Sequence, residues 1–339
     1  MNDKQQILNI LHSAVESRVS MTRTLQITRA WVTKLTSSLL EAGIIEAREV
    51  KDSPFGRPQQ MLAVKAGQFY SLNIMLRSHG LQATLNDYNT LQPTAAAVEY
   101  PLHAPLSADQ LADTVNNLLA ELCGMAAVDA SQVRHIGLAL GGGIEQHSGV
   151  VRWSPVLKEQ HYNLRERLRQ TTGIATAVVN IAWCSCHMIN KRIDCRDSWI
   201  ALMPGFGSLG YGYCINGKPG LGDNGFYPEI VHLPYAGGLE NALQFDETAA
   251  QQSAERAAAA LCFAICCTAP IHNIKRVILS GELFEDHADL IIPLTAKLLA
   301  DNPSEHINTI RLEYMPAPYN YSMFGLVQLS SDAITDTLI

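Results

Sequence analysis

The chain begins with side chains whose types suit recognition of duplex DNA. Arg29, Thr33, Lys34 and Ser37 fall on one face if residues 28–43 form a helix. Basic side chains contact phosphates and guanine, and short hydroxyl side chains reach base edges in the major groove. We therefore predict that this face contacts DNA, through these residues: Thr28, Arg29, Ala30, Thr33 and Lys34.

A second group of residues has the donor atoms of a metal site but lacks the spacing. Cys184, Cys186 and His187 lie within four residues on a predicted helix. Residues two apart on a helix point away from each other, so the two thiols do not chelate one ion together. Cys184 and His187 are three apart and could do so, but two further ligands for a tetrahedral site are not evident. We expect neither a bound metal nor a cofactor.

The helix that carries the DNA-contacting side chains has a clear start, apolar face and end. Thr28 is a suitable N-cap, and Gly43 follows the last turn, where a left-handed residue commonly ends a helix. Val32, Leu35 and Leu39 recur at helical spacing on the opposite face. This pattern predicts that the helix packs through one face and exposes the other.

The neighbouring segments complete the order of a winged helix-turn-helix. Residues 4–14 and 17–25 predict two helices before the helix at 28–43. The segments IIEAREV and QQMLAV flank a turn, DSPFGRP, and predict a two-stranded wing. Arg57 lies at its tip between glycine and proline, where an arginine side chain can enter a narrow minor groove. The alternative is a small helical module used for protein contacts.

The charge distribution agrees with this interpretation. Residues 1–60 hold eight Lys or Arg and six Asp or Glu, a net charge of +2, although the whole chain has a formal net charge of −7. Such a contrast is typical of a DNA-reading module attached to an acidic body. The chain has 339 residues, lacks an uncharged apolar run of 18 residues and starts with a polar segment, MNDKQQ. We therefore expect a cytoplasmic protein of several domains with no membrane span.

After residue 65 the pattern alternates between strands and helices, which predicts an α/β body with ligands at the carboxyl ends of strands. The predicted strands are 68–75, 81–86, 135–140, 176–180, 199–203, 211–215 and 276–279. The predicted helices are 108–126, 164–172, 182–190 and 249–269. We divide the chain into a DNA-binding domain at 1–65, a small lobe at 66–181 with 318–339, and a large lobe at 182–317 that carries a dimerisation surface.

The order of several blocks makes the chain resemble the ROK family of repressors and sugar kinases, in its repressor branch. These blocks are the winged helix with its GRP turn, HIGLALGGGIEQHSGVVRWSP, TGIATAVVN, GYGYCINGKPGLG, PEIVH and VILSG. The resemblance implies an actin-like ATPase fold whose two lobes close over a sugar. It also implies a ligand site at Gly142, Asn180, Glu229 and His232. A satisfied structural pair is the alternative for Glu229 and His232.

The chain departs from the family pattern where the kinases carry their chemistry. The phosphate loop Asp-x-Gly-x-Thr is replaced by residues Asn73 to Arg77, with Met75 in place of the glycine. The catalytic base of the kinases is replaced by Ile181, which cannot accept a proton. The cysteine cluster that holds zinc in the repressor branch is absent after His232. These losses predict a protein that is not an enzyme.

The sugar site implied by the resemblance is also changed. Val156 stands where the family has an asparagine, and Val231 stands where it has a glycine. Each lost polar contact costs a sugar roughly 1–3 kcal/mol. We predict a homodimeric regulator of carbohydrate-related genes, most simply a repressor, that binds operator DNA and responds to a sugar or sugar-phosphate effector. The alternatives are a sugar kinase with an atypical site and a regulator controlled by a protein partner.

Overall fold

A computed structural model describes residues 3–49, 60–193, 197–205, 208–316 and 321–338. The N-terminal unit, called the head below, contains three helices and a small sheet. The helices are α1 (Asp3–Ser13), α2 (Arg18–Leu25) and α3 (Arg29–Glu41). The strands β1 (Glu16–Ser17), β3 (Gln60–Val64) and β2 (Ile45–Glu49) pair in that order, with antiparallel register. The three predicted helices and both wing strands are therefore present, and Arg57 lies outside the described residues.

Local signals set the bounds of the head helices. The Ser17 side chain accepts a hydrogen bond from the Ser20 backbone N–H and caps α2. Thr28 caps α3 in the same way through the Trp31 N–H, at 3.3 Å. Gly43 follows with a φ of +68°, a left-handed conformation that favours glycine. The apolar faces of the helices meet in one core with the sheet.

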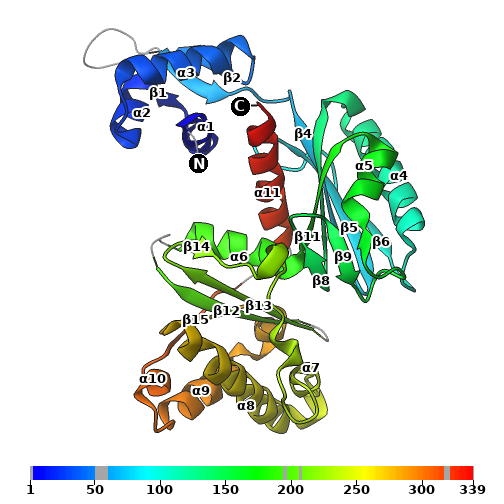
Figure 1. The fold of residues 1–339 in the computed structure, drawn as a ribbon, viewed down its shortest axis with the longest axis vertical. Helices are drawn as coiled ribbons and strands as arrows, with labels where there is room; N and C mark the ends of the chain where they lie inside the picture. The colour runs from blue at the N-terminus through cyan, green and yellow to red at the C-terminus, as the bar shows by residue number, and fades with distance from the viewer. Residues whose placement is uncertain (1–2, 50–59, 194–196, 206–207, 317–320, 339) are drawn as a thin grey trace.

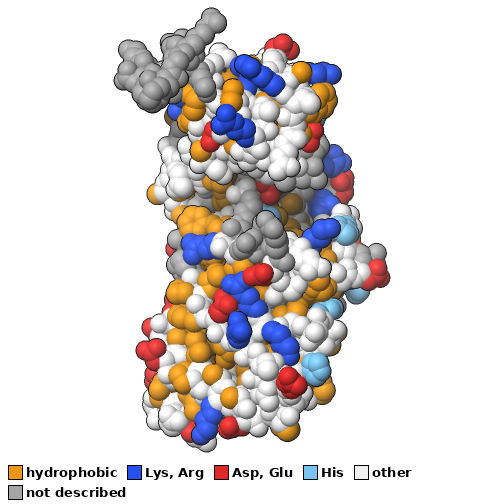
Figure 2. All heavy atoms as spheres, turned by 90° about the vertical axis from the view of Figure 1, so that its left-hand side faces the viewer, with side chains coloured by type: hydrophobic (Ala, Val, Ile, Leu, Met, Phe, Trp, Pro, Cys, Tyr) orange, Lys and Arg blue, Asp and Glu red, His pale blue; other side chains and the backbone are white. Residues whose placement is uncertain are grey.

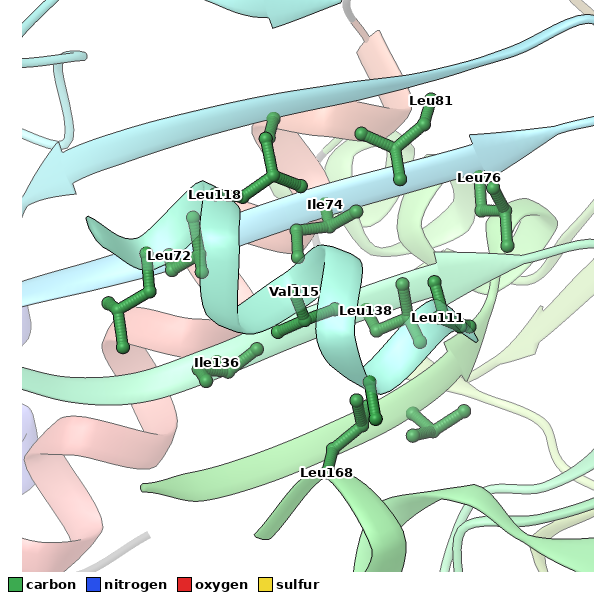
Figure 3. Close-up of a cluster of buried hydrophobic side chains, with 14 of the residues drawn as sticks. Leu72, Ile74, Leu76, Leu81, Leu111, Val115, Leu118, Ile136, Leu138 and Leu168 are labelled. Carbon is green, nitrogen blue, oxygen red and sulfur yellow. The ribbon is translucent and has the colours of Figure 1, made fainter. Parts of the chain in front are cut away.

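The first lobe is a five-stranded sheet with helices on both faces (Figure 1). Its order is β11 (Ala175–Asn180), β7 (Val133–Leu140), β4 (Tyr70–Arg77), β5 (Gly80–Asp87) and β6 (Val98–Pro101), in which β11, β7 and β4 are parallel. Helices α4 (Ala108–Ala126) and α5 (Leu164–Thr172) cover one face. Figure 3 shows leucine, isoleucine and valine side chains of the sheet and these helices interdigitating in the core.

A short three-stranded sheet extends the first lobe toward the second. It contains β8 (Gly143–Glu145), β9 (Val150–Trp153) and β10 (Tyr162–Asn163), all antiparallel. The turn before β8 and the end of β9 lie close together, because the Ser154 hydroxyl donates to the Gly141 carbonyl at 2.7 Å. This contact fixes the glycine segment at the carboxyl end of β7.

The second lobe is built on another five-stranded sheet. Its order is β14 (Lys218–Pro219), β13 (Ser208–Ile215), β12 (Trp199–Gly205), β15 (Arg276–Leu279) and β16 (Arg311–Tyr314). Helices α7 (Leu239–Ala242), α8 (Ala250–Thr268) and α9 (Leu283–Ala300) pack in the core beside it, and α10 (Glu305–Asn308) follows α9. Helix α9 was not predicted from the sequence.

One helical segment of this lobe tests the expectation that no membrane span is present. Residues Glu247–His272 are long and apolar enough to cross a membrane by length and composition alone. Half of the apolar window is buried inside the protein, however, and Ala257, Leu261 and Ile265 of α8 pack in the core of the lobe. We interpret this segment as a core helix.

Two adjacent helices connect these parts. Helix α6 (Ile181–Arg192) packs against α11 (Tyr321–Leu338), and α11 also covers the second face of the first-lobe sheet along β7 and β4. Figure 1 shows α11, in red, running between the second lobe and the head. The chain therefore returns from the second lobe to the head through one continuous helix.

Candidate effector cleft and DNA-contacting surface

The predicted DNA-contacting side chains lie on the exposed face of α3. Arg29, Ala30, Thr33 and Lys34 are exposed, and Thr28 is exposed at the N-cap. Residues Val32, Leu35 and Leu39 on the other face are buried in the head core. The helix is therefore fixed by its apolar face, and its polar face is available to a partner. Figure 2 shows Lys and Arg side chains at the end of the molecule formed by the head.

Trp31 is part of the same surface, although it was not among the residues predicted from the sequence to contact DNA. The residue is 39% exposed, and its indole N–H donates to the Asp3 carboxylate at 2.7 Å. The Lys34 ammonium lies 5.2 Å from the centre of its ring, a cation–π distance. Trp31 lies off the apolar stripe formed by Val32, Leu35 and Leu39, and this place in the sequence indicated that its side chain would be exposed. The pair places an aromatic ring and a cation together on the exposed side of α3.

Arg18 has a different role from the exposed basic residues of α3. Its side chain donates to the Thr36 hydroxyl at 2.8 Å and to the Gln60 amide oxygen at 2.7 Å. Thr36 is fully buried. Arg18 therefore links α2, α3 and β3, and it holds α3 against the small sheet of the head.

A cleft of about 700 Å³ lies between the two lobes, and all four predicted ligand residues line it. Gly142 and Asn180 come from the first lobe, at the ends of adjacent parallel strands. Glu229 and His232 come from the segment between β14 and α7. The volume is typical of a small-molecule site. Contact of these four residues with a ligand remains a prediction.

Asn180 and Gly142 shape the wall of the cleft through contacts with each other. The Asn180 amide donates to the Gly142 carbonyl at 2.9 Å and accepts from the Ala182 N–H at 2.8 Å, so it also caps α6. Gly142 has a φ of +118°, and a Cβ added there would lie 2.3 Å from the Trp153 carbonyl oxygen. Only glycine allows the backbone to lie this close to Trp153. The hydrogen bond from Asn180 holds Gly142 in that position.

Glu229 and His232 form a close pair at the cleft. The Glu229 Oε2 and His232 Nε2 atoms are 3.3 Å apart. The Glu229 side chain is 13% exposed, whereas that of His232 is 68% exposed. Burial raises the pKa of Glu229 despite the opposing effect of His232. The Glu229 carboxyl group is therefore mostly shielded from water, and its partner His232 is exposed. A ligand with hydrogen-bond donors could bind to this carboxyl group.

The positions that depart from the family pattern are found in the same cleft. Val156, Ile181 and Val231 all line it, and Val156 is only 2% exposed. The replacement of polar by apolar side chains therefore changes the cleft itself. A ligand that matches this wall has an apolar face where a kinase substrate would offer hydroxyl groups.

Two residues at the position of the family's phosphate loop are used for packing. Asn73 is fully buried; its amide nitrogen donates to the Ser71 hydroxyl and to Asn86, and its oxygen accepts from Ser330 of α11 at 2.7 Å. Met75 is 2% exposed and packs with α11 residues. Neither residue is among those that line the cleft. Asn73 and Met75 thus fix α11, whereas Leu76 and Arg77 at the end of the same strand line the cleft.

The cysteine and histidine group on α6 is divided between two environments. Cys184 packs with residues of β4, β7 and α11, whereas Cys186 packs with residues of the second lobe. The His187 ring instead approaches the Asp332 carboxylate at 3.5 Å. Within the described residues, no group of three His, Cys, Asp or Glu side chains is arranged to hold a metal ion.

Comparison with known proteins identifies relatives in sequence. The ROK family model matches residues 90–242. The DNA-binding transcriptional dual regulator NagC of Escherichia coli K12 is 26% identical over 231 residues, which cover 64% of this chain and 53% of the relative. The N-acetylglucosamine repressor of Shigella flexneri matches with the same identity and coverage. The aligned region thus spans about half the length of these curated relatives.

Solved structures share the fold. A ROK family transcriptional regulator, a homologue of the E. coli MLC protein, has a TM-score of 0.78 at 15% identity and covers 99% of this chain and 98% of its own. A ROK hexokinase from Thermus thermophilus has a TM-score of 0.61 at 14% identity and covers 79% of this chain and 100% of its own. A glucokinase from Streptomyces griseus, solved with glucose and AMPPNP, has a TM-score of 0.60 at 14% identity and covers 77% of this chain and 99% of its own.

Proposed function

We propose that this ROK family protein, a relative of the NagC and Mlc-type regulators, is a DNA-binding transcriptional regulator with a non-catalytic effector cleft. The observation that carries the proposal is the head with its exposed α3 face. The hexokinase matches over its whole length yet covers 79% of this chain, whereas the regulator covers 99%. The hexokinase leaves about a fifth of this chain uncovered, and the head accounts for a similar share of the chain.

The exposed face of α3 would enter the major groove. Arg29 and Lys34 supply charge for phosphates or guanine, and Thr33 supplies a short side chain. A homodimer would place two such helices on successive turns of a pseudo-palindromic operator. The second lobe offers apolar surface for this contact: Ile271, Leu290 and Leu298 are exposed on it, and Figure 2 shows hydrophobic side chains gathering over this lobe.

The cleft would bind an effector without transferring a phosphoryl group. Ile181 lines the cleft where the kinases of the family have their base, and it cannot take a proton from a hydroxyl group. Asn73 is fully buried in a hydrogen-bond network with α11. We therefore propose that binding energy in this cleft is used to shift a conformational equilibrium.

Helix α11 provides a physical connection from the cleft. Tyr321 and Ser322 at its first turn line the cleft, and the Ser322 hydroxyl lies 2.7 Å from that of Ser185 on α6. In the next turn, Gly325 approaches the Cys184 carbonyl so closely that an added Cβ would lie 2.0 Å from its oxygen. The start of α11 is therefore held tightly against α6.

The other end of α11 is part of the head interface. Ile334 is buried in the head core together with Tyr88 of the first lobe, whose hydroxyl lies 2.8 Å from that of Thr335. Gln5 of α1 donates to the Asp336 carboxylate at 3.0 Å. A shift of α11 caused by cleft closure would therefore move the head. In a dimer, this would change the separation of the two reading helices and hence operator affinity.

The DNA that lies upstream of the chain's own gene provides the test. Purified protein should retard this DNA in a gel-shift titration, and Arg29→Ala should weaken binding by at least about tenfold if a phosphate or base contact is lost. Arg311→Ala, an exposed arginine in the second lobe, is the matched control and should leave binding unchanged. Equal affinity of Arg29→Ala and wild-type protein would remove α3 from the interface.

An activity assay separates this proposal from the kinase alternative. A coupled ADP-release assay with common hexoses and amino sugars should show no turnover by the wild-type protein. Turnover that is lost on Glu229→Gln substitution would mean that the cleft is catalytic.

A further inference from the structure

The charged side chains of the cleft are predominantly acidic. Glu229, Glu240 and Glu282 line it, and Arg77 is the only Lys or Arg among the described lining residues. The Arg77 guanidinium already lies 3.1 Å from the Glu282 carboxylate. Among the Asp, Glu, Lys and Arg side chains of the lining, three carboxylates and one guanidinium leave two negative charges in excess. Such a cleft repels an anion and concentrates cations, because its walls have a low dielectric constant.

Two of these carboxyl groups, those of Glu229 and Glu240, come from one segment of the chain and are partly buried. Glu240 lies in α7 and Glu229 lies shortly before it in the chain. Burial raises the pKa of each, and the Glu240 carboxylate further raises that of Glu229. The effect of His232 on both groups is in the opposite direction, but its ring is mostly exposed. A ligand cation would provide the positive charge that these carboxylates lack.

The other walls fit the organic part of such a cation. Trp153 lines the cleft with its side chain 37% exposed, and an aromatic face attracts ammonium groups. Val156 and Ile181 add apolar surface. The Ser280 hydroxyl, in a lining residue that is 1% exposed, has no hydrogen-bond partner among the described residues. The cleft thus combines acidic groups, an aromatic ring, apolar patches and an unpartnered hydroxyl.

From this combination we infer that the cleft binds a small organic cation that carries an ammonium group, of about the size of an amino sugar, and that it discriminates against phosphorylated ligands. The ammonium group lies between Glu229 and Glu240, and the apolar face of the ligand lies toward Trp153 and Val156. The role of this ligand as an effector rests on the proposed function, whereas its binding does not.

Calorimetric titration of the full chain with three hexoses tests this inference. Glucosamine carries an ammonium group, N-acetylglucosamine is its uncharged analogue, and glucose 6-phosphate carries an anion. We expect glucosamine to bind at least about tenfold more tightly than the other two, which corresponds to about 1.4 kcal/mol. Glu240→Gln should remove this preference, because the affinity for glucosamine falls toward that for N-acetylglucosamine. Glu255→Gln, at an exposed position on α8, is the control and should behave as wild type.

Three results would overturn the inference: equal or tighter binding of N-acetylglucosamine or of glucose 6-phosphate, no binding of glucosamine up to about 10 mM, or an unchanged preference in a folded Glu240→Gln protein. Glu229→Gln gives a second, independent variant, and its circular dichroism melting curve shows whether it folds. The gel shift without ligand reports on the proposed function separately. If the protein binds glucosamine but not the upstream DNA, the proposed regulator function is contradicted, whereas the inferred ligand preference of the cleft is supported.

Discussion

The contact between α11 and α6 at Gly325 gives a quantitative prediction about the connection from cleft to head. An alanine Cβ at this position would lie 2.0 Å from the Cys184 carbonyl oxygen and 2.6 Å from its carbonyl carbon. Ordinary contact begins at 3.4 Å, so the two helices must separate locally by about 1.4 Å. The obstructing atoms belong to the backbone of α6 and cannot turn away as a flexible side chain would.

The energetic effect follows from two opposing terms. Forcing an extra methyl group into a packed interior costs typically about 1–3 kcal/mol. Alanine gains about 0.5–1 kcal/mol over glycine inside a helix. Gly124→Ala in α4 is the matched control, because an added Cβ there has no neighbour within 4 Å. The helix-propensity terms are similar in the two variants, so their difference in unfolding free energy should be about 1–3 kcal/mol.

Urea denaturation followed by circular dichroism measures this difference. Gly124→Ala should move the midpoint upward and Gly325→Ala should move it downward. The gel shift should also show that any effect of a cleft ligand on DNA affinity is reduced in Gly325→Ala and intact in Gly124→Ala. Equal stability of the two variants would mean that α6 and α11 do not pack this closely, and the proposed connection would then lose its basis.

Two further predictions concern the head interface and a buried histidine. Ile334→Ala shortens an α11 side chain that is buried in the head core and should weaken head docking by about 2–5 kcal/mol, seen as faster release of the head in limited proteolysis; an unchanged rate would argue against this docking contact. Burial, with a smaller effect of Arg165, lowers the pKa of His135 to about 4 from its usual 6.5. The unfolded chain therefore binds a proton that the folded protein does not, and stability should fall as the pH decreases from about 6.5 to about 4, by about 2 kcal/mol at pH 5. Urea midpoints at pH 7 and pH 5 measure this loss, which should be smaller in His135→Leu; an equal loss in both proteins would contradict the assignment.

The elements that the sequence predicted well are those whose signals are local. Helix α4 spans 108–126 and α5 spans 164–172, as predicted, because apolar residues recur at helical spacing and capping residues mark the ends. Helix α11 was not predicted as a helix. It packs through small residues, including Gly325 and Ser330, against α6 and the sheet. Its buried face mixes apolar residues such as Leu326, Val327 and Ile334 with glycine and serine, so the apolar stripe is interrupted.

The exposed polar face of α3 and the replacement of the kinase residues were both determined by the sequence alone. Each depends on residue types at fixed spacing within a few turns or on a replaced side chain such as Ile181. The charge of the cleft was decided only by the tertiary structure, because Arg77, Glu240 and Glu282 come from distant segments that meet between the lobes. The same holds for the connection of the cleft to the head, since hydrogen bonds and close packing between segments far apart in sequence exist only once the chain has folded.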